Sequence, residues 1–191
     1  MKKIIDIVIN NMREDYISEV VDLSDREFGT GYISRKDVMN SINYSKHTLK
    51  VAILNQEVIG FYLGWVVEKN NIPSKLNIPS NLLPLEFKET KQIAVLKSIV
   101  VSEKFQGLGV GSKLIKSCID DFYDKGIQTI STVAWKSKMG INIEGPISRL
   151  NFKPVLEIKD YWKDVSKNYS CPECKTPPCR CSAVIYVTKK L

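Results

Sequence analysis

The feature that most constrains this chain is a glycine-rich turn between a predicted strand and a predicted helix. Residues 91–102 are rich in β-branched side chains, which indicates a strand, and residues 109–123 carry apolar side chains at helical spacing. Gly107, Gly109 and Gly111 occupy every second position at the junction. Glycine lets the backbone take unusual dihedrals and lets an anion approach its amides. Because these amides also begin a helix, the turn is predicted to bind a phosphate group.

Two familiar phosphate-binding loops do not fit this turn. The dinucleotide-binding fingerprint requires G-x-G-x-x-G, whereas the spacing here is G-x-G-x-G. The P-loop requires Gly-Lys before Ser or Thr, and Gly111-Ser112-Lys113 has a different order. A purely structural interpretation also stays open, in which the glycines only allow tight packing of the strand on the helix.

The other elements describe one domain that spans residues 1–191, a length typical of a single domain. Helices are predicted at 13–28, 35–42 and 143–150, and strands at 3–9, 48–54, 58–67, 128–135, 152–162 and 183–188. Ser34, with Asp37 three residues later, is the predicted cap of the second helix. Residues 70–90 contain three prolines and are expected to form an irregular excursion. This order indicates an α/β fold with one mixed sheet.

The chain carries a formal net charge of +7. A lysine-rich surface and an attraction for an anionic ligand explain this charge equally well. The basic residues are spread along the chain, so no nucleic-acid-binding tail is indicated. No apolar run approaches the roughly 20 residues that span a bilayer. Asp6 interrupts the first apolar run, which is therefore expected to be a strand of a cytoplasmic protein and not a signal peptide.

Four of the five cysteines form a compact cluster in the predicted Cys-rich loop 168–182, between the last two strands. They are Cys171, Cys174, Cys179 and Cys181, with the spacing C-x₂-C-x₄-C-x-C. Four thiolates are a common ligand set for zinc, and a site with four protein ligands is structural. Two reducible disulfides or a redox pair are the alternatives. Cys118 lies among apolar residues at helical spacing and is predicted to be a core thiol.

The turn and its surroundings resemble the GNAT superfamily of acyl-CoA-dependent N-acetyltransferases. The family motif R/Q-x-x-G-x-G/A is matched by Gln106, Gly109 and Gly111, and the apolar end of the preceding strand by Ile99–Val101. The order of elements also resembles the family over nearly the whole chain. The resemblance implies a single-domain, mostly antiparallel central sheet with helices on both faces.

The resemblance further implies that acetyl-CoA is the cosubstrate and that an amine of a small molecule, peptide or protein accepts the acetyl group directly. The turn would hold the CoA pyrophosphate, the strand edge would pair with the pantetheine arm, and amides near Val101 would stabilise the oxyanion. The residues that the resemblance assigns to the cofactor are Ile99, Val100, Val101, Gln106, Gly107, Leu108, Gly109, Val110, Gly111, Ser112 and Asn142.

The catalytic residues of the family have no match in this sequence. The usual Tyr proton donor falls on Ile147, and the Glu base of some members falls near Ile93. Glu89 is a candidate base instead, and Tyr161 a candidate proton donor, although each also fits a structural role. A non-catalytic module that binds acyl-CoA, or that contacts a protein through the zinc loop, is therefore the alternative function.

Three aromatic residues, Tyr62, Trp65 and Trp135, are predicted to form the wall of an acceptor groove. Tyr62 is also considered as a proton donor. His47 has polar neighbours and is expected at the surface.

Overall fold

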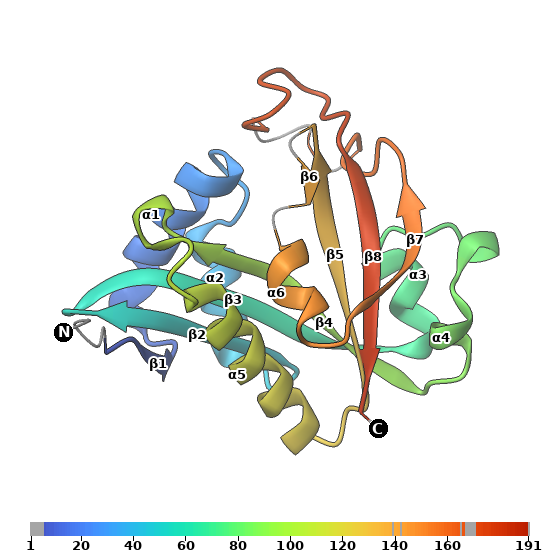
Figure 1. Ribbon diagram of the computed structural model, residues 1–191, viewed down its shortest axis with the longest axis horizontal. Coiled ribbons are helices and arrows are strands. Elements are labelled where there is room, and N and C mark those ends of the chain that lie inside the picture. The colour runs from blue at the N-terminus through green and yellow to red at the C-terminus, as the bar shows by residue number, and fades with distance from the viewer. Residues whose placement is uncertain (1–5, 139, 142, 165, 167–170, 191) are drawn as a thin grey trace.

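The computed structural model describes residues 6–138, 140–141, 143–164, 166 and 171–190. They form one mixed sheet with helices on both faces, as predicted (Figure 1). The strands, in their order across the sheet, are β1 (Val8–Asn11), β2 (His47–Leu54), β3 (Glu57–Glu68), β4 (Gln92–Val101), β5 (Thr129–Ser137), β8 (Ser182–Lys189) and β7 (Lys153–Ile158). A short strand, β6 (Gly140–Ile141), pairs with the end of β5. All pairs are antiparallel except β4 with β5.

The parallel pair β4 and β5 is joined over a short stretch only. Ala94–Leu96 pair with Ile130–Thr132, and beyond these residues the two strands diverge (Figure 1). The register of β4 against β3 also shifts at this point, because Leu63 pairs with Ser98 whereas Gly64 pairs with Leu96. Lys97 is therefore the extra residue of a bulge, a feature that redirects side chains and bends strands. Strands β4 and β5 therefore separate at the position of the bulge in β4.

One face of the sheet carries two long helices and a run of short ones. α1 (Ile17–Phe28) and α2 (Arg35–Asn43) cover β2 and β3, and the predicted cap of α2 at Ser34 is confirmed as a capping box with Asp37. Residues 70–90 are more regular than predicted. They form short turns that bury Ile72 and Phe87 against the sheet. These turns are η2 (Lys69–Asn71), α3 (Ile72–Lys75), η3 (Ser80–Leu82) and α4 (Leu85–Lys88).

The opposite face carries α5 (Val110–Asp124) and the shorter α6 (Glu144–Ser148). The apolar side of α5 is buried, and the predicted core thiol Cys118 is fully buried within it. Gly64 of β3 permits this close packing. A Cβ atom at Gly64 would lie 2.8 Å from Cζ of Phe122 on α5, so a larger residue would displace the helix.

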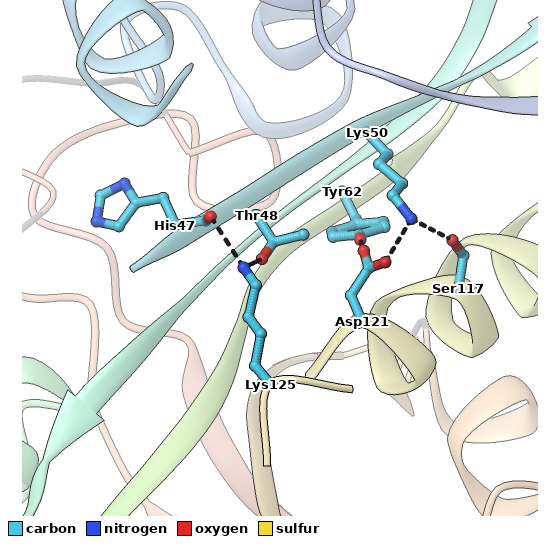
Figure 2. A network of polar contacts seen from close by, with 7 residues as sticks. All are labelled: His47, Thr48, Lys50, Tyr62, Ser117, Asp121 and Lys125. Carbon is cyan, nitrogen blue, oxygen red and sulfur yellow. Dashed lines mark hydrogen bonds and ion pairs between the residues drawn. The ribbon is translucent and has the colours of Figure 1, made fainter. Parts of the chain in front are cut away.

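A polar network lies under α5 and joins it to two strands (Figure 2). The Nζ atom of Lys50 on β2 lies 2.5 Å from Asp121 Oδ1 and 3.2 Å from Ser117 Oγ. The hydroxyl of Tyr62 on β3 donates a hydrogen bond to the other Asp121 oxygen, and the Tyr62 side chain is fully buried. The prediction that Tyr62 belongs to an acceptor groove is therefore wrong, because its side chain lies beneath the helix.

Two predicted strands have different limits. The strand predicted at 3–9 is β1 at Val8–Asn11, with residues 1–5 outside the described part of the chain. The strand predicted at 152–162 ends at Ile158, because a turn with a left-handed residue at Asp160 follows. Tyr161 and Trp162 consequently lie in the connection to the Cys-rich loop. Within the described residues, none of the helices has both the length and the apolar character that crossing a bilayer requires.

Candidate functional site

A cavity of about 590 Å³ occupies the opening between the diverging ends of β4 and β5. It reaches both faces of the sheet. On the α5 face it is lined by the glycine turn and by α6, with Arg149 at its rim. On the opposite face it is lined by Tyr32, Lys97, Trp135 and Trp162, together with part of the Cys-rich loop. We call these ends the glycine end and the aromatic end.

The backbone of the glycine turn has the conformation that its sequence predicts. Gly107 and Gly109 have φ values of 75° and 82°, in the left-handed region that favours glycine. Gly109 is the N-cap of α5, and the first helical bond runs from the Lys113 amide to the Gly109 carbonyl. The amides of Val110, Gly111 and Ser112 precede that bond and have no acceptor within the helix. These donors lie beside the cavity and can hold an anionic group.

Nearly all of the residues predicted to bind the cofactor lie together at the glycine end. Ile99, Val100, Val101, Gln106, Gly107, Gly109, Val110, Gly111 and Ser112 line the cavity. Leu108 is 50% exposed and is not among the lining residues. Asn142 lies outside the described residues. The geometry groups these residues in one place, and their binding to CoA stays a prediction.

A contact between α1 and the turn fixes the glycine end. The Gln106 side chain donates a hydrogen bond of 3.0 Å to the Val101 carbonyl and lies 3.5 Å from a Glu27 oxygen. The other Glu27 oxygen accepts the Glu103 amide at 3.2 Å. Arg149 adds a cation to the rim of the same end. Sequence reasoning missed Arg149, because an isolated arginine after a short helix carries no motif.

Aromatic rings surround Lys97 at the aromatic end. Its Nζ atom lies 5.4 Å from the centre of the Tyr32 ring and 5.9 Å from the Trp65 and Trp162 rings. The Tyr32 hydroxyl and the Ser98 hydroxyl are 3.5 Å apart, and both residues line the cavity. Trp135 lines it as well, whereas Trp65 is set back behind Lys97 and lines only a small adjoining cavity.

Neither candidate catalytic residue lies on the cavity. Glu89 ends α4 and is highly exposed, with its carboxylate 3.8 Å from Lys189 Nζ. Tyr161 is buried, and its hydroxyl donates a hydrogen bond of 2.5 Å to the Leu76 carbonyl. Burial raises the pKa of Tyr161 well above its usual range. His47, expected at the surface, is half-buried between Tyr44 and Trp65.

The four clustered cysteines converge on a single point. Their sulfur atoms all lie within 4.8 Å of one another. Cys174 Sγ is 3.8 Å from Cys179 Sγ and 3.7 Å from Cys181 Sγ. A tetrahedral zinc with Zn–S bonds of about 2.3 Å separates its sulfurs by about 3.8 Å, so the donor set and its geometry fit zinc. A disulfide requires about 2.05 Å between sulfurs, and all five cysteines are free thiols.

Backbone amides support the sulfur atoms of this cluster. The Arg180 amide donates to Cys174 Sγ at 3.3 Å, and this bond lowers the pKa of the Cys174 thiol. Burial raises the pKa of Cys181 to about 11. Cys171, Pro172 and Cys179 also line the large cavity, so the cluster forms part of the aromatic end.

A family model described as "Acetyltransferase (GNAT) family" matches residues 13–137. No curated protein matches the sequence significantly.

Solved structures match in fold over almost the full length. The ribosomal-protein-S18-alanine N-acetyltransferase from Escherichia coli matches with a TM-score of 0.66 and 15% identity, over 96% of this chain and 94% of that chain. The polyamine N-acetyltransferase from Drosophila melanogaster matches with a TM-score of 0.69 and 11% identity, over 97% and 100%. The NatC complex bound to Gag peptide and CoA matches with a TM-score of 0.67 and 12% identity, over 97% of this chain and 99% of that chain.

Proposed function

The chain belongs to the acetyltransferase (GNAT) family, and on this premise we propose that it transfers an acetyl group from acetyl-CoA to an amine. The observation that carries the proposal is the cavity between β4 and β5, which has an anion-binding turn at one end and a polar, aromatic chamber at the other. Such a cavity gives two reactants access to one another through the sheet. One of the similar structures contains CoA, which supports the choice of cosubstrate.

Each part of the cavity has a role in this proposal. The amides of Val110–Ser112 hold the pyrophosphate, helped by the helix dipole. The edge of Ile99–Val101 that faces the opening has no strand partner among the described residues, so it can pair with the amides of the pantetheine arm. In this arrangement the thioester would lie near the bulge at Lys97, where β4 and β5 cease to pair.

The reaction that this arrangement supports is direct transfer. The nitrogen of a neutral amine forms a bond to the thioester carbonyl carbon, the C–S bond breaks, and CoA leaves as a thiolate. The nitrogen then loses a proton to give the amide, and the thiolate takes up a proton to give CoA. Amides near Val101 stabilise the oxyanion. At the aromatic end, the hydroxyls of Tyr32 and Ser98 lie 3.5 Å apart. We propose that these hydroxyls form hydrogen bonds with the reacting atoms.

The cysteine cluster is proposed to hold one structural zinc ion. The four thiolates would occupy all four tetrahedral positions and leave none for a substrate. Zinc binding would fix the loop that carries Cys171 and Cys179 against Trp162, and it would thereby shape the aromatic end. No step of the transfer uses the metal.

Acetyl-CoA binding, measured by calorimetry, tests the function with a matched pair of glycine variants. Gly109→Glu introduces a side chain at φ 82° and a carboxylate beside the turn, whereas Gly126→Glu introduces the same change at φ 76° at the other end of α5. Neither new Cβ atom meets a neighbour within 4 Å. We expect Gly109→Glu to weaken binding by about tenfold or more, since like charges repel strongly at a binding site. Gly126→Glu should bind as the wild type does.

The outcomes separate the two candidate functions. Absence of acetyl-CoA binding to the wild type, or equal binding by both variants, would contradict the proposal. Binding without acetylation of any amine in a broad acceptor screen would favour the non-catalytic module instead.

A further inference from the structure

Among the described residues, the ammonium of Lys97 has no carboxylate partner. Lys97 is half-buried at the bulge of β4, and its Nζ atom lies 5.4–5.9 Å from the centres of three aromatic rings. In the described part of the chain, no carboxylate oxygen lies within the 4.0 Å ion-pair limit of its Nζ atom. Lys50, on strand β2, is by contrast paired with Asp121. Lys97 therefore keeps an unneutralised positive charge beside the cavity.

Two further hydrogen-bond donors without acceptors belong to aromatic residues that surround Lys97. Among the described residues, three buried side-chain polar atoms have no hydrogen-bond partner, and two of them are the Nε1 atoms of Trp65 and Trp162. The centres of both indole rings lie 5.9 Å from Lys97 Nζ. Buried donors are nearly always satisfied in native proteins, because an unsatisfied one is destabilising. Lys97 and both of these tryptophans line one small cavity, an arrangement that favours an acceptor from outside the chain.

A small side cavity lies at the same place. It has a volume of about 20 Å³ and is lined by Trp65, Trp162, Lys97, Lys75 and apolar residues, with Tyr161 at its edge. Lys97, Val133 and Trp162 line both cavities, so the two adjoin one another. Among the described residues, no acidic side chain lines the side cavity, and Glu27 is the acidic residue that lines the large one. The electrostatic environment thus favours an anion and disfavours a second cation.

We propose, on the basis of the acetyl-transfer function above, that the acceptor is an amine that also carries a carboxylate. The carboxylate binds Lys97 and accepts hydrogen bonds from the indole N–H groups of Trp65 and Trp162. A carboxylate accepts several hydrogen bonds and offers no donor, which matches a group of donors without acceptors. Lys97 then acts as a specificity determinant: it orients amino acids and related amines and excludes diamines, whose distal ammonium would meet its charge.

Acceptor preference can be measured with three amines of similar length that differ at the distal end. 4-Aminobutyrate carries a carboxylate, n-butylamine a methyl group and 1,4-diaminobutane an ammonium. The wild type should acetylate 4-aminobutyrate with a kcat/KM about tenfold or more above that of the other two, since a hydrogen bond to a charged group contributes a factor of this size. Acetylated products are quantified by mass spectrometry.

Lys97→Met tests the role of the charge, because methionine keeps the length and the aromatic contacts of the side chain. It should lower kcat/KM for 4-aminobutyrate by about tenfold or more and leave n-butylamine within about threefold. The affinity for acetyl-CoA should not change. Lys163→Met is the matched control, because Lys163 is exposed and lines neither cavity. It should leave all three acceptors unchanged.

A binding measurement separates this proposal from the transfer function. The three tryptophans of the chain, Trp65, Trp135 and Trp162, all line one or other cavity, so intrinsic fluorescence reports on this site. Titration with butyrate in the presence of CoA should give a saturable change that n-butylamine does not give and that Lys97→Met abolishes. Preference for the diamine, an unchanged preference in Lys97→Met, or no response to butyrate would overturn the proposal. A failure to bind acetyl-CoA would instead overturn the proposed function.

Discussion

The ammonium of Lys50 and the carboxylate of Asp121 lie 2.5 Å apart beneath α5, with the hydroxyl of Tyr62 bonded to the same carboxylate (Figure 2). The Lys50 and Asp121 side chains are only 18% and 21% exposed. The network therefore joins β2, β3 and α5 through charges that are largely removed from water. Loss of one partner leaves another partner unpaired in this setting, which is far more destabilising than loss of an exposed pair.

Asp121→Leu should lower the free energy of unfolding by about 2–3 kcal/mol. The same substitution should cost less in a chain that already carries Lys50→Met. Urea unfolding of both single variants and the double variant gives the coupling energy, which we expect to be about 1 kcal/mol or more. The exposed pair Lys136 and Glu157 is the control, with side chains 41% and 43% exposed. Its coupling should be below about 1 kcal/mol. Equal coupling in the two pairs would argue against a special role for the network.

Tyr161→Phe distinguishes a structural tyrosine from a proton donor. The hydroxyl of Tyr161 is bonded to the Leu76 carbonyl, so its removal should destabilise the fold by about 1 kcal/mol. The kcat of acetylation should stay within a few-fold of the wild-type value. A loss of about a hundredfold in kcat, with the fold intact by circular dichroism, would restore Tyr161 as a general acid.

Removal of zinc should act on the aromatic end and not on the glycine end. We expect one zinc ion per chain by elemental analysis and its loss in Cys174→Ser. Because Cys171 and Cys179 line the cavity, the metal-free protein should show a raised KM for the acceptor and a lower melting temperature, with an unchanged Kd for acetyl-CoA. Cys118→Ala should keep the metal, since Cys118 lies in the core under α5. An unchanged acceptor KM after complete zinc removal would refute this link.

His47 should make the fold less stable in mild acid. Its pKa is lowered by burial and by the charges of Lys75 and Lys125, and its ring packs against Tyr44 and Trp65. The unfolded chain therefore binds the proton first as the pH falls below about 6.5, so the free energy of unfolding decreases until the folded form is protonated as well. His47→Gln removes this contribution.

The measurement compares urea unfolding at pH 7.5 and pH 5.0. The wild type should lose more stability than His47→Gln over this interval, and His47 is the only histidine in the chain. An equal loss in both proteins would show that the ring titrates alike in the folded and unfolded states.

Features that depend on neighbouring residues in the chain could be predicted from the sequence. The capping box at Ser34, the left-handed glycines of the turn and the apolar side of α5 all follow from local rules. The mostly antiparallel sheet with helices on both faces was predicted from the resemblance to a family, because local rules do not contain it. The cysteines were predicted to gather because they lie close in sequence, and they do.

The aromatic end could not be predicted, because it depends on contacts between distant segments and on one bulge. Tyr62 and Trp65 are three residues apart in one strand, so they point to opposite faces and could not share a wall. Lys97 is directed by the bulge in β4, whose position depends on the register with β3. Trp162 lies near Lys97 because it belongs to a turn, whereas the sequence predicted a strand there.

The cavity is built partly from the segment that matches the family model and partly from residues that follow it. The strand, turn and helix of the glycine end lie within the matched residues 13–137, whereas α6 and Arg149 of the same end follow them. At the aromatic end, Tyr32, Lys97 and Trp135 lie within the matched part of the chain, and Trp162, Cys171 and Cys179 come from beyond it. Changes in the C-terminal residues can therefore alter the wall of the aromatic end while the glycine turn stays as it is. Both ends of the cavity thus combine residues of the matched segment with residues that follow it.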